Sequence, residues 1–167
     1  MGKMKTLLCS IFIIFSSCVS DKKEGPVISD ATLYGLTQSA TSFSYYKNNL
    51  DTLDSDPASP HFPYVRIRFN SRAVSVMNGG LSGLTATSFP DESMIVKEVY
   101  DVKGGSLQTY AVMYKSKNAG NSGNGWVWNE MRADGSVIYS SARKGDQCVS
   151  CHQSGTAVDL VRTFGLH

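Results

Sequence analysis

Two cysteines and a histidine near the C-terminus have the types and spacing that could do chemistry. They lie in the run Cys148-Val149-Ser150-Cys151-His152. This C-x-x-C-H pattern is the attachment signature of c-type haem. Two thiols at this spacing can add to the two vinyl groups of one porphyrin, and the adjoining imidazole can coordinate the iron. The pattern predicts one covalent haem c on Cys148 and Cys151, with His152 as the axial iron ligand.

Three other interpretations of the same pattern stay open. A structural zinc site would need a second pair of ligands, for which only the distant His61 and His167 remain. A thioredoxin-like redox pair would begin a helix after a strand in a βαβ pattern, which the sequence does not show. A short motif can also match by chance.

The N-terminus has the pattern of an export signal. Lys3 and Lys5 precede an almost wholly apolar run over 7–15, and small residues lead to Cys18. This is typical of a signal peptide over residues 1–17. The apolar run is too short for a bilayer span of about 20 residues. The exit Phe15-Ser16-Ser17-Cys18 resembles a bacterial lipobox, which predicts lipidation of Cys18; an ordinary cleaved signal with an incidental cysteine is the alternative.

This N-terminus sets the expected organisation and location. Residues 18–31 are rich in charged and small residues and are expected to form a tether, and 32–167 to form the haem domain. The protein is expected on the periplasmic side of a bacterial membrane, anchored by lipid on Cys18. Export favours the haem interpretation, because haem is attached to such sites outside the cytoplasm.

Composition limits the remaining classes. The chain has 167 residues, 41% hydrophobic and 18% charged, which is typical of one folded domain and excludes a disordered chain. Its 15 glycines and 5 prolines follow no period, which excludes a collagen-like chain. The formal charge of +2 comes without a basic face, so no nucleic-acid partner is expected.

Hydrophobic periodicity predicts an α+β fold, mainly an antiparallel β-sheet with a few short helices. In the N-terminal half we expect a helix over 33–50, with Leu36, Phe43, Tyr46 and Leu50 facing inward, then a proline-rich loop over 54–63. The run 64–69 alternates as a half-buried strand, with Arg66 and Arg68 opposite the apolar side chains. A short helix over 71–77, capped by Ser71, should follow.

Strands dominate the C-terminal half. We expect them over 94–100, 108–115 and 126–131, with a hairpin over 131–139 and a short helix or strand over 158–164. The connections are short, which favours antiparallel pairing.

These stretches together resemble the cytochrome P460 family, which includes the related β-sheet cytochromes c-prime. The resemblance runs over about 64–164 and rests on YVRIRFN (64–70) with Ala73 following, FPDESMIVKEVY (89–100), YAVMYK (110–115), GWVWNE (125–130), CVSCH (148–152) and DLV (159–161). It implies a mostly antiparallel β-fold, a homodimer and a periplasmic c-type haem.

The family has two functional kinds. The resemblance to P460 enzymes implies hydroxylamine oxidation and a lysine–porphyrin cross-link. The resemblance to β-sheet cytochromes c-prime implies a cramped aromatic pocket that binds nitric oxide without a cross-link. We expect binding and oxidation of hydroxylamine or a similar small nitrogen species, with electrons passed to a periplasmic partner protein. A five-coordinate nitric oxide binder and a simple electron-transfer cytochrome are the alternatives.

Two charged residues are candidates for catalysis. Lys97 shares a strand face with Ile95 and Val99, so it could reach the haem edge and form the cross-link; a solvated lysine paired with a carboxylate is the alternative. Lys115 is a weaker candidate for the same role. Glu130 shares its face with two tryptophans and could accept protons from an N–H substrate, or could be a surface carboxylate.

The far side of the iron is expected to be open or capped by an aromatic ring. His61 and His167 are poorly placed as second ligands, and each methionine on a strand is more often a core residue. The possible methionine ligands are Met77, Met94, Met113 and Met131, the possible caps are Phe62, Phe69 and Phe89, and the possible partners of the haem propionates are Arg143, Lys144 and Arg162.

Overall fold

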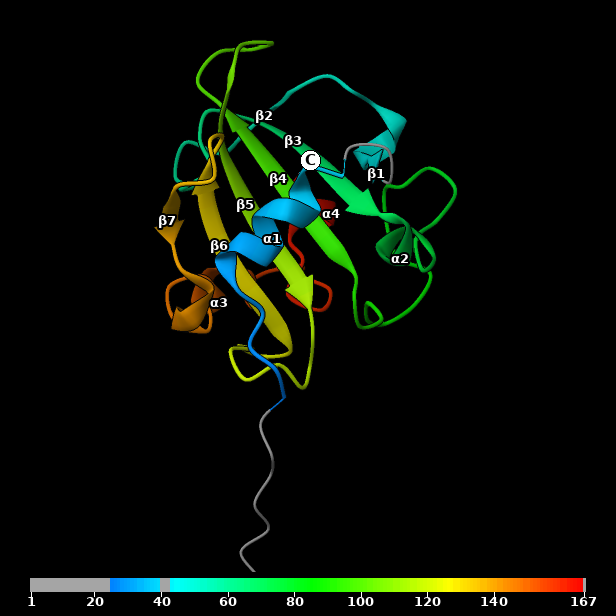
Figure 1. Cartoon of the computed structure of the whole chain (residues 1–167). Coiled ribbons are helices and arrows are strands. Elements are labelled where there is room, and N and C mark those ends of the chain that lie inside the picture. The colour runs from blue at the N-terminus through cyan, green and yellow to red at the C-terminus, as the bar shows by residue number, and fades with distance from the viewer. Residues whose placement is uncertain (1–24, 40–42, 167) are drawn as a thin grey trace, which may run out of the picture.

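The fold is built around one twisted antiparallel sheet (Figure 1). The computed structural model describes residues 25–39 and 43–166. Within them the sheet has seven strands in the order β1-β3-β4-β5-β6-β7, and β2 pairs with β3 outside this path. The strands are β1 (Phe43–Tyr45), β2 (Leu53–Asp54), β3 (Tyr64–Asn70), β4 (Met94–Tyr100), β5 (Leu107–Lys115), β6 (Trp126–Arg132) and β7 (Val137–Tyr139). The predicted α+β class is confirmed.

The sheet separates two hydrophobic cores, because successive side chains of a strand point to opposite faces. In β4, Ile95 and Val99 belong to one cluster, whereas Met94 and Val96 belong to the other. The first cluster includes Trp126 and Trp128 and is covered by the C-terminal segment. The second cluster is closed by Leu33 of α1 (Asp30–Thr37). Both faces of the central strands are therefore buried.

The expected helix over 33–50 is wrong after Thr37. Helix α1 spans Asp30–Thr37, and Phe43 begins β1, whose residues pair with the end of β3. Leu36 and Leu50 are exposed, whereas Tyr46, in the short 3-10 helix η2 (Tyr46–Asn48), is buried and Phe43 packs, partly buried, against the second cluster, as expected for these two. The free edge of β3 offers backbone hydrogen bonds that a helix over these residues would leave unmade, which accounts for the strand.

Asp30 ties the start of α1 to the sheet. Its carboxylate accepts hydrogen bonds from the Asn129 side chain, the Ser140 hydroxyl and the backbone amide of Ser141, at 2.7 to 2.8 Å. Burial alone would raise the pKa of Asp30, but these hydrogen bonds outweigh it and lower the pKa. Residue Gly25 already pairs with Ala119, so the packed part of the chain extends into the segment 18–31 expected as a tether.

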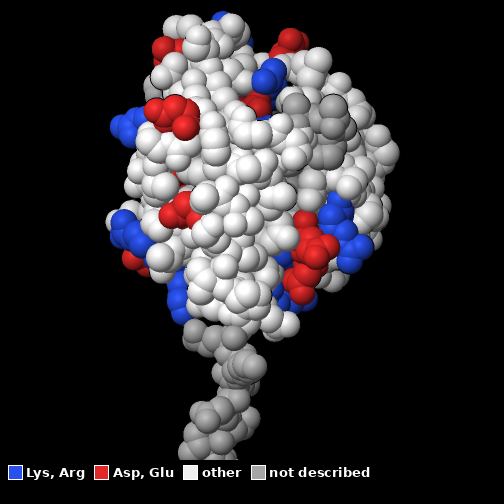
Figure 2. All heavy atoms as spheres, in the orientation of Figure 1, with Lys and Arg blue, Asp and Glu red and all other residues white. Residues whose placement is uncertain are grey.

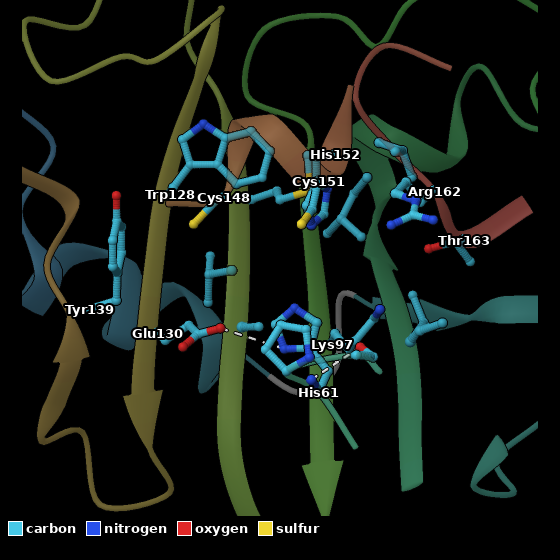
Figure 3. A pocket seen from close by; sticks show the side chains of 18 of the residues that line it. His61, Lys97, Trp128, Glu130, Tyr139, Cys148, Cys151, His152, Arg162 and Thr163 are labelled. Atoms are coloured by element: carbon cyan, nitrogen blue, oxygen red, sulfur yellow. Dashed lines mark hydrogen bonds and ion pairs between the residues drawn. The ribbon is translucent and has the colours of Figure 1, made fainter. Parts of the chain in front are cut away.

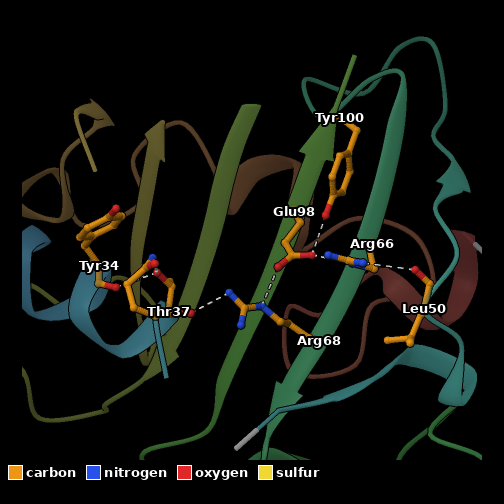
Figure 4. Close-up of polar contacts among 8 residues, drawn as sticks. Tyr34, Thr37, Leu50, Arg66, Arg68, Glu98 and Tyr100 are labelled. Atoms are coloured by element: carbon orange, nitrogen blue, oxygen red, sulfur yellow. Dashed lines mark hydrogen bonds and ion pairs between the residues drawn. The ribbon is translucent and has the colours of Figure 1, made fainter. Parts of the chain in front are cut away.

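The face of β3 expected to carry Arg66 and Arg68 outward is not uniformly solvated. Arg68 is 3% exposed, and its Nε lies 3.0 Å from Glu98 Oε1 without hydrogen-bond alignment. It also donates to the carbonyl oxygen of Thr37 at 2.8 Å (Figure 4). Glu98 further accepts hydrogen bonds from Arg66 at 2.7 Å and Tyr100 at 3.0 Å. Helix α1 and β1 cover this face, so the arginine is buried together with its counter-ion.

The remaining elements are short. Helix α2 (Ser71–Val74) is capped by Asn70 and not by the expected Ser71, because Asn70 Oδ1 accepts from the amide of Ala73. The C-terminal segment holds η3 (Ser141–Arg143), α3 (Val149–His152) and α4 (Thr163–Leu166). Over 158–164 the structure has a bridge between Val158 and Val161 followed by the start of α4.

Two predictions from the sequence concern residues that the structure does not describe. The signal peptide over 1–17 and the lipidated Cys18 lie outside the described residues. Within the described residues, no helix is both long and apolar enough to cross a membrane.

On the face shown in Figure 2, acidic and basic side chains are scattered and both signs occur, without a single-sign patch.

Candidate haem site

A cavity of about 350 Å³ lies between the sheet and the C-terminal segment. This volume falls within the range of cofactor and ligand pockets, about 300–1,000 Å³. Its walls come from β3, β4, β5 and β6, from the loop over 56–61, and from the segment over 147–163. Figure 3 shows Cys148, Cys151 and His152 on one side of this cavity, and Lys97, Glu130 and His61 grouped away from them. The fold therefore brings the C-x-x-C-H motif, the two catalytic candidates Lys97 and Glu130, and His61 into one pocket.

The motif is held by a tight turn against β6. Gly145 has a φ of +74°, and its carbonyl oxygen accepts hydrogen bonds from the amides of Cys148 and Val149. A Cβ at Gly145 would lie 2.4 Å from the Trp128 ring, so glycine is required there both for its φ and for the close approach. Cys148 and Cys151 are both free thiols, and burial raises the pKa of Cys148 to about 11. The turn thus presents both thiols to the cavity.

His152 is prepared as a ligand through one ring nitrogen. Its Nδ1 lies 2.8 Å from the carbonyl oxygen of Leu160, which can only accept, so Nδ1 carries the proton and Nε2 keeps a free lone pair. Burial lowers the pKa of His152 to about 4, so the ring is neutral at neutral pH. The Trp128 ring meets it edge-on, with 4.8 Å between centroids. A neutral imidazole whose other nitrogen donates to a carbonyl is the arrangement found in metal-ligating histidines.

The donor set therefore fits a covalently bound haem: two free thiols, a neutral oriented histidine and an adjoining cavity. A zinc site does not fit equally well. Among residues 25–39 and 43–166, no three or more His, Cys, Asp and Glu side chains converge on a common point where they could hold a metal ion. His167, one of the two distant candidates for a zinc ligand, lies outside the described residues.

Lys97 points into the pocket from the middle of β4, where Ile67 and Ala111 are its neighbours on β3 and β5. Burial, together with the positive charge of Arg162, lowers the pKa of Lys97 to about 8, while the charge of Glu130 opposes the shift. A sizeable fraction of this amine is therefore neutral at mildly alkaline pH. The alternative of a freely solvated strand lysine does not describe this side chain.

Glu130 and His61 lie together in the pocket. The distance from His61 Nδ1 to Glu130 Oε1 is 3.5 Å. Burial, with added repulsion from Lys97 and His152, lowers the pKa of His61 to about 3. His61 is therefore neutral, and the pair is a polar contact and not an ion pair. Burial raises the pKa of Glu130, and the charge of Lys97 partly offsets this. Glu130 is thus a pocket carboxylate and not the surface residue of the alternative interpretation.

A family model for cytochrome P460 matches residues 66–163, which contain most of β3, the strands β4 to β7 and the C-x-x-C-H motif. The chain belongs to the cytochrome P460 family. Membership implies that it is a cytochrome that binds haem c. No curated protein matches the chain.

Sequence reasoning named His61 only as a distant zinc candidate and a poorly placed second ligand. His61 follows Pro57 and Pro60 in a loop, with no periodicity to show which way the ring faces. The loop returns to the sheet because the amide of Ser55 donates to the carbonyl oxygen of Pro63 and β2 pairs with β3. This return places His61 in the pocket, where the sequence alone indicated a poorly placed residue.

The expected phenylalanine cap is wrong. None of the three candidates lines the pocket: Phe62 is half exposed, Phe69 stacks on Phe164, and Phe89 packs edge-on against Trp126. The aromatic side chains that do line it are those of Trp128 and Tyr139. Phe69 and Phe89 fill the core beside the pocket, where their large apolar rings are fully removed from water.

The methionine, arginine and lysine candidates also differ in whether they line the pocket. Met113 lines the pocket, whereas Met94 and Met131 belong to the core on the opposite face and Met77 to the core beside the pocket. Arg162 lines the pocket, but Arg143 pairs with Asp146 at 3.2 Å and, like Lys144, does not line it. Lys115 is also excluded from the pocket wall, because its Nζ lies 2.6 Å from Asp159. Of these methionine, arginine and lysine candidates, only Met113 and Arg162 line the pocket.

Neutral His61 makes this cytochrome P460 sensitive to acid. The unfolded chain protonates His61 near pH 6.5, whereas the folded chain keeps it neutral down to about pH 3. Its contribution to the free energy of unfolding is fully present above pH 6.5 and is lost as the pH falls from there towards 3. Two pH units below 6.5, we expect the free energy of unfolding to be lower by about 2–3 kcal/mol than above pH 6.5. Urea unfolding at a series of pH values across this range measures the loss. His61→Gln should make the free energy of unfolding less dependent on pH between 6.5 and 3. An unchanged pH dependence in this variant would contradict the role given to His61.

Proposed function

We propose that this protein is an exported, lipid-anchored mono-haem cytochrome that binds and oxidises hydroxylamine or a similar small nitrogen compound. A periplasmic acceptor protein takes the electrons. The observation that carries the proposal is the grouping of Lys97, Glu130 and His61 in the same cavity as the C-x-x-C-H motif. A plain electron carrier has no need of a carboxylate and a neutral histidine beside its ligand pocket.

Cys148 and Cys151 would hold the haem through thioether bonds, and His152 would coordinate its iron through Nε2. When bound, the haem supplies an iron site for the small ligand and accepts electrons from it. The Leu160 carbonyl keeps the His152 proton on Nδ1, so Nε2 stays available to the metal.

Glu130 would act as the proton acceptor. Oxidation of an N–H or O–H compound releases a proton with each electron removed, and a nearby base makes that step easier. The pKa of Glu130 is raised by burial, which makes its carboxylate a stronger base than a solvated one. His61, 3.5 Å away and neutral, gives this carboxylate a polar neighbour that does not compete with it for the proton.

Lys97 would supply the covalent link to the porphyrin that the P460 kind implies. A neutral amine is the form of lysine that can bond to a porphyrin carbon. The new C–N bond would replace one N–H and one C–H bond, so two protons and two electrons would leave, and a two-electron oxidant of the peroxide class would have to take up the electrons. The lowered pKa of Lys97 provides this form at mildly alkaline pH. Its position on β4, facing the cavity, puts the amine within the space that a haem would share with it.

A second candidate is a five-coordinate cytochrome that binds nitric oxide without turnover. The apolar part of the pocket wall favours it, since Ile67, Ile95, Met113 and Val161 would suit a small uncharged gas. A six-coordinate electron carrier would instead use His61 or Met113 as the second ligand. The polar group around Glu130 makes the enzyme the better proposal.

The location and assembly follow from the sequence. Lipid on Cys18 would attach the protein to the periplasmic side of a bacterial membrane, and the family resemblance favours a homodimer. The partners would be the small nitrogen ligand, the membrane and a redox protein.

The enzyme proposal is tested by mass and absorption of the haem-loaded protein. Protease digestion should yield one species that joins the Lys97 peptide to the 148–152 peptide through haem, and the reduced protein should show the absorption band that names the family. Lys97→Met should separate the two peptides and restore an ordinary c-type spectrum, whereas Lys115→Met should retain the link. Unlinked peptides and an ordinary spectrum in the wild type would favour the nitric oxide binder.

A further inference from the structure

The segment that follows the motif folds back to contact the proximal histidine. Val158 and Val161 pair with each other, and between them Asp159 and Leu160 have φ of 49° and 67°. Two consecutive non-glycine residues in the left-handed region are unfavourable and persist only when their surroundings hold them. The carbonyl oxygen of Leu160 is the acceptor of the His152 Nδ1 proton. Whatever holds this turn therefore also orients the histidine.

Asp159 is held on three sides. Its Oδ1 lies 2.6 Å from Lys115 Nζ, and its Oδ2 accepts from the amide of Phe89 at 2.8 Å. Its backbone carbonyl oxygen accepts from Trp126 Nε1 at 2.9 Å. The side chains of Lys115 and Asp159 are only 3% and 13% exposed. Each charge is thus enclosed with its partner, and loss of one would leave the other uncompensated.

Two of the three residues that hold Asp159 belong to the sheet. Lys115 ends β5 and lies opposite Trp126, which begins β6, whereas Phe89 lies in the loop before β4. The Lys115 ammonium also lies over the Trp126 ring, 4.7 Å from its centroid. The turn over 158–161 is therefore attached to two adjacent strands and to the loop before β4, and not only to its chain neighbours.

We propose that the Lys115–Asp159 pair is a positioning device for the proximal histidine and thereby sets the reduction potential of the haem. This rests on the proposed coordination of iron by His152. A firm hydrogen bond from Nδ1 makes the imidazole a stronger donor to the metal, which stabilises the oxidised state and lowers the potential. Lys115 and Asp159 touch neither the haem pocket nor the substrate; they act through the Leu160 carbonyl.

The decisive variant is Lys115→Met combined with Asp159→Asn. It removes both charges, so it leaves the net charge near the haem unchanged while it releases the turn. We expect the potential of the haem-loaded protein to rise, with the ferrous form favoured about tenfold more, which corresponds to about 59 mV for one electron. The iron–histidine stretching frequency should fall in parallel. Lys115→Arg, which can keep the ion pair and the ring contact, should retain the wild-type potential.

Controls separate positioning from simple charge and from general damage. If the double variant does not accumulate, Lys115→Met alone serves: loss of a positive charge by itself would lower the potential, so a rise identifies the lost positioning and a fall overturns the proposal. Arg68→Met, which breaks a buried ion pair on the other face of the sheet (Figure 4), should lower stability without moving the potential.

The failure of this proposal and the failure of haem attachment give different results. A coloured double variant with an unchanged potential and an unchanged iron–histidine frequency would overturn the positioning role. A wild-type protein that carries no haem on Cys148 and Cys151 would instead overturn the proposed function.

Discussion

Replacing Cys148 and Cys151 together by serine should abolish covalent haem attachment. Both thiols border the pocket and both are free, and a thioether bond needs the sulfur that serine lacks. Wild-type protein matured in a periplasm should keep its haem through denaturation, and intact mass should exceed the polypeptide and lipid by one haem. The double variant should weigh only polypeptide and lipid.

The single variants and a neighbour provide the controls. Cys148→Ser and Cys151→Ser should each keep one thioether bond, which shifts the reduced absorption band without removing the haem. Ser150→Ala changes an exposed residue inside the motif and should load normally. A wild-type protein of polypeptide mass, or a double variant that retains haem after denaturation, would contradict the attachment site.

Replacing Glu130 by glutamine should slow hydroxylamine oxidation by about 10²–10⁴-fold, the usual contribution of a general base. Glutamine has nearly the same shape and can still contact His61, but it cannot accept a proton. We expect hydroxylamine to bind with little change, because the loss affects the proton step. Steady-state turnover with an artificial electron acceptor, together with ligand titration, separates the two effects.

The pH profile of turnover gives an independent check. Burial raises the pKa of Glu130, so the active carboxylate form is lost as the pH falls through a value above that of an ordinary glutamate. This acid limb should disappear in Glu130→Gln. Glu92→Gln, which alters an exposed carboxylate, should leave turnover and profile unchanged. Wild-type turnover in Glu130→Gln would exclude Glu130 as the base, whereas a wild-type protein that binds hydroxylamine without oxidising it would favour the nitric oxide binder.

Much of the sheet could be predicted because strand patterning is local. The runs that form β3, β4, β5 and β6 alternate or are continuously apolar, and the structure has strands there within one residue of the expected bounds. The error over 33–50 has a physical cause. Residues such as Phe43 suit either a helix face or a strand. They form a strand here because their backbone pairs with the free edge of β3. The burial of Arg68 likewise depends on α1 and β1 covering its face.

Some features of the candidate site are set by neighbouring residues in the chain, and others are set only by the tertiary structure. The sequence by itself determined the attachment motif and which side chains share a strand face with Lys97 and Glu130, because a two-residue spacer and the alternation of a strand are properties of consecutive residues. Only the tertiary structure decided that these two faces line the pocket, that His61 meets Glu130, that Phe69 and Phe89 stay in the core, and that Lys115 holds Asp159 behind the proximal histidine. Those contacts join loops and strand ends far apart in the chain, and the packing of the whole sheet sets the distances between them.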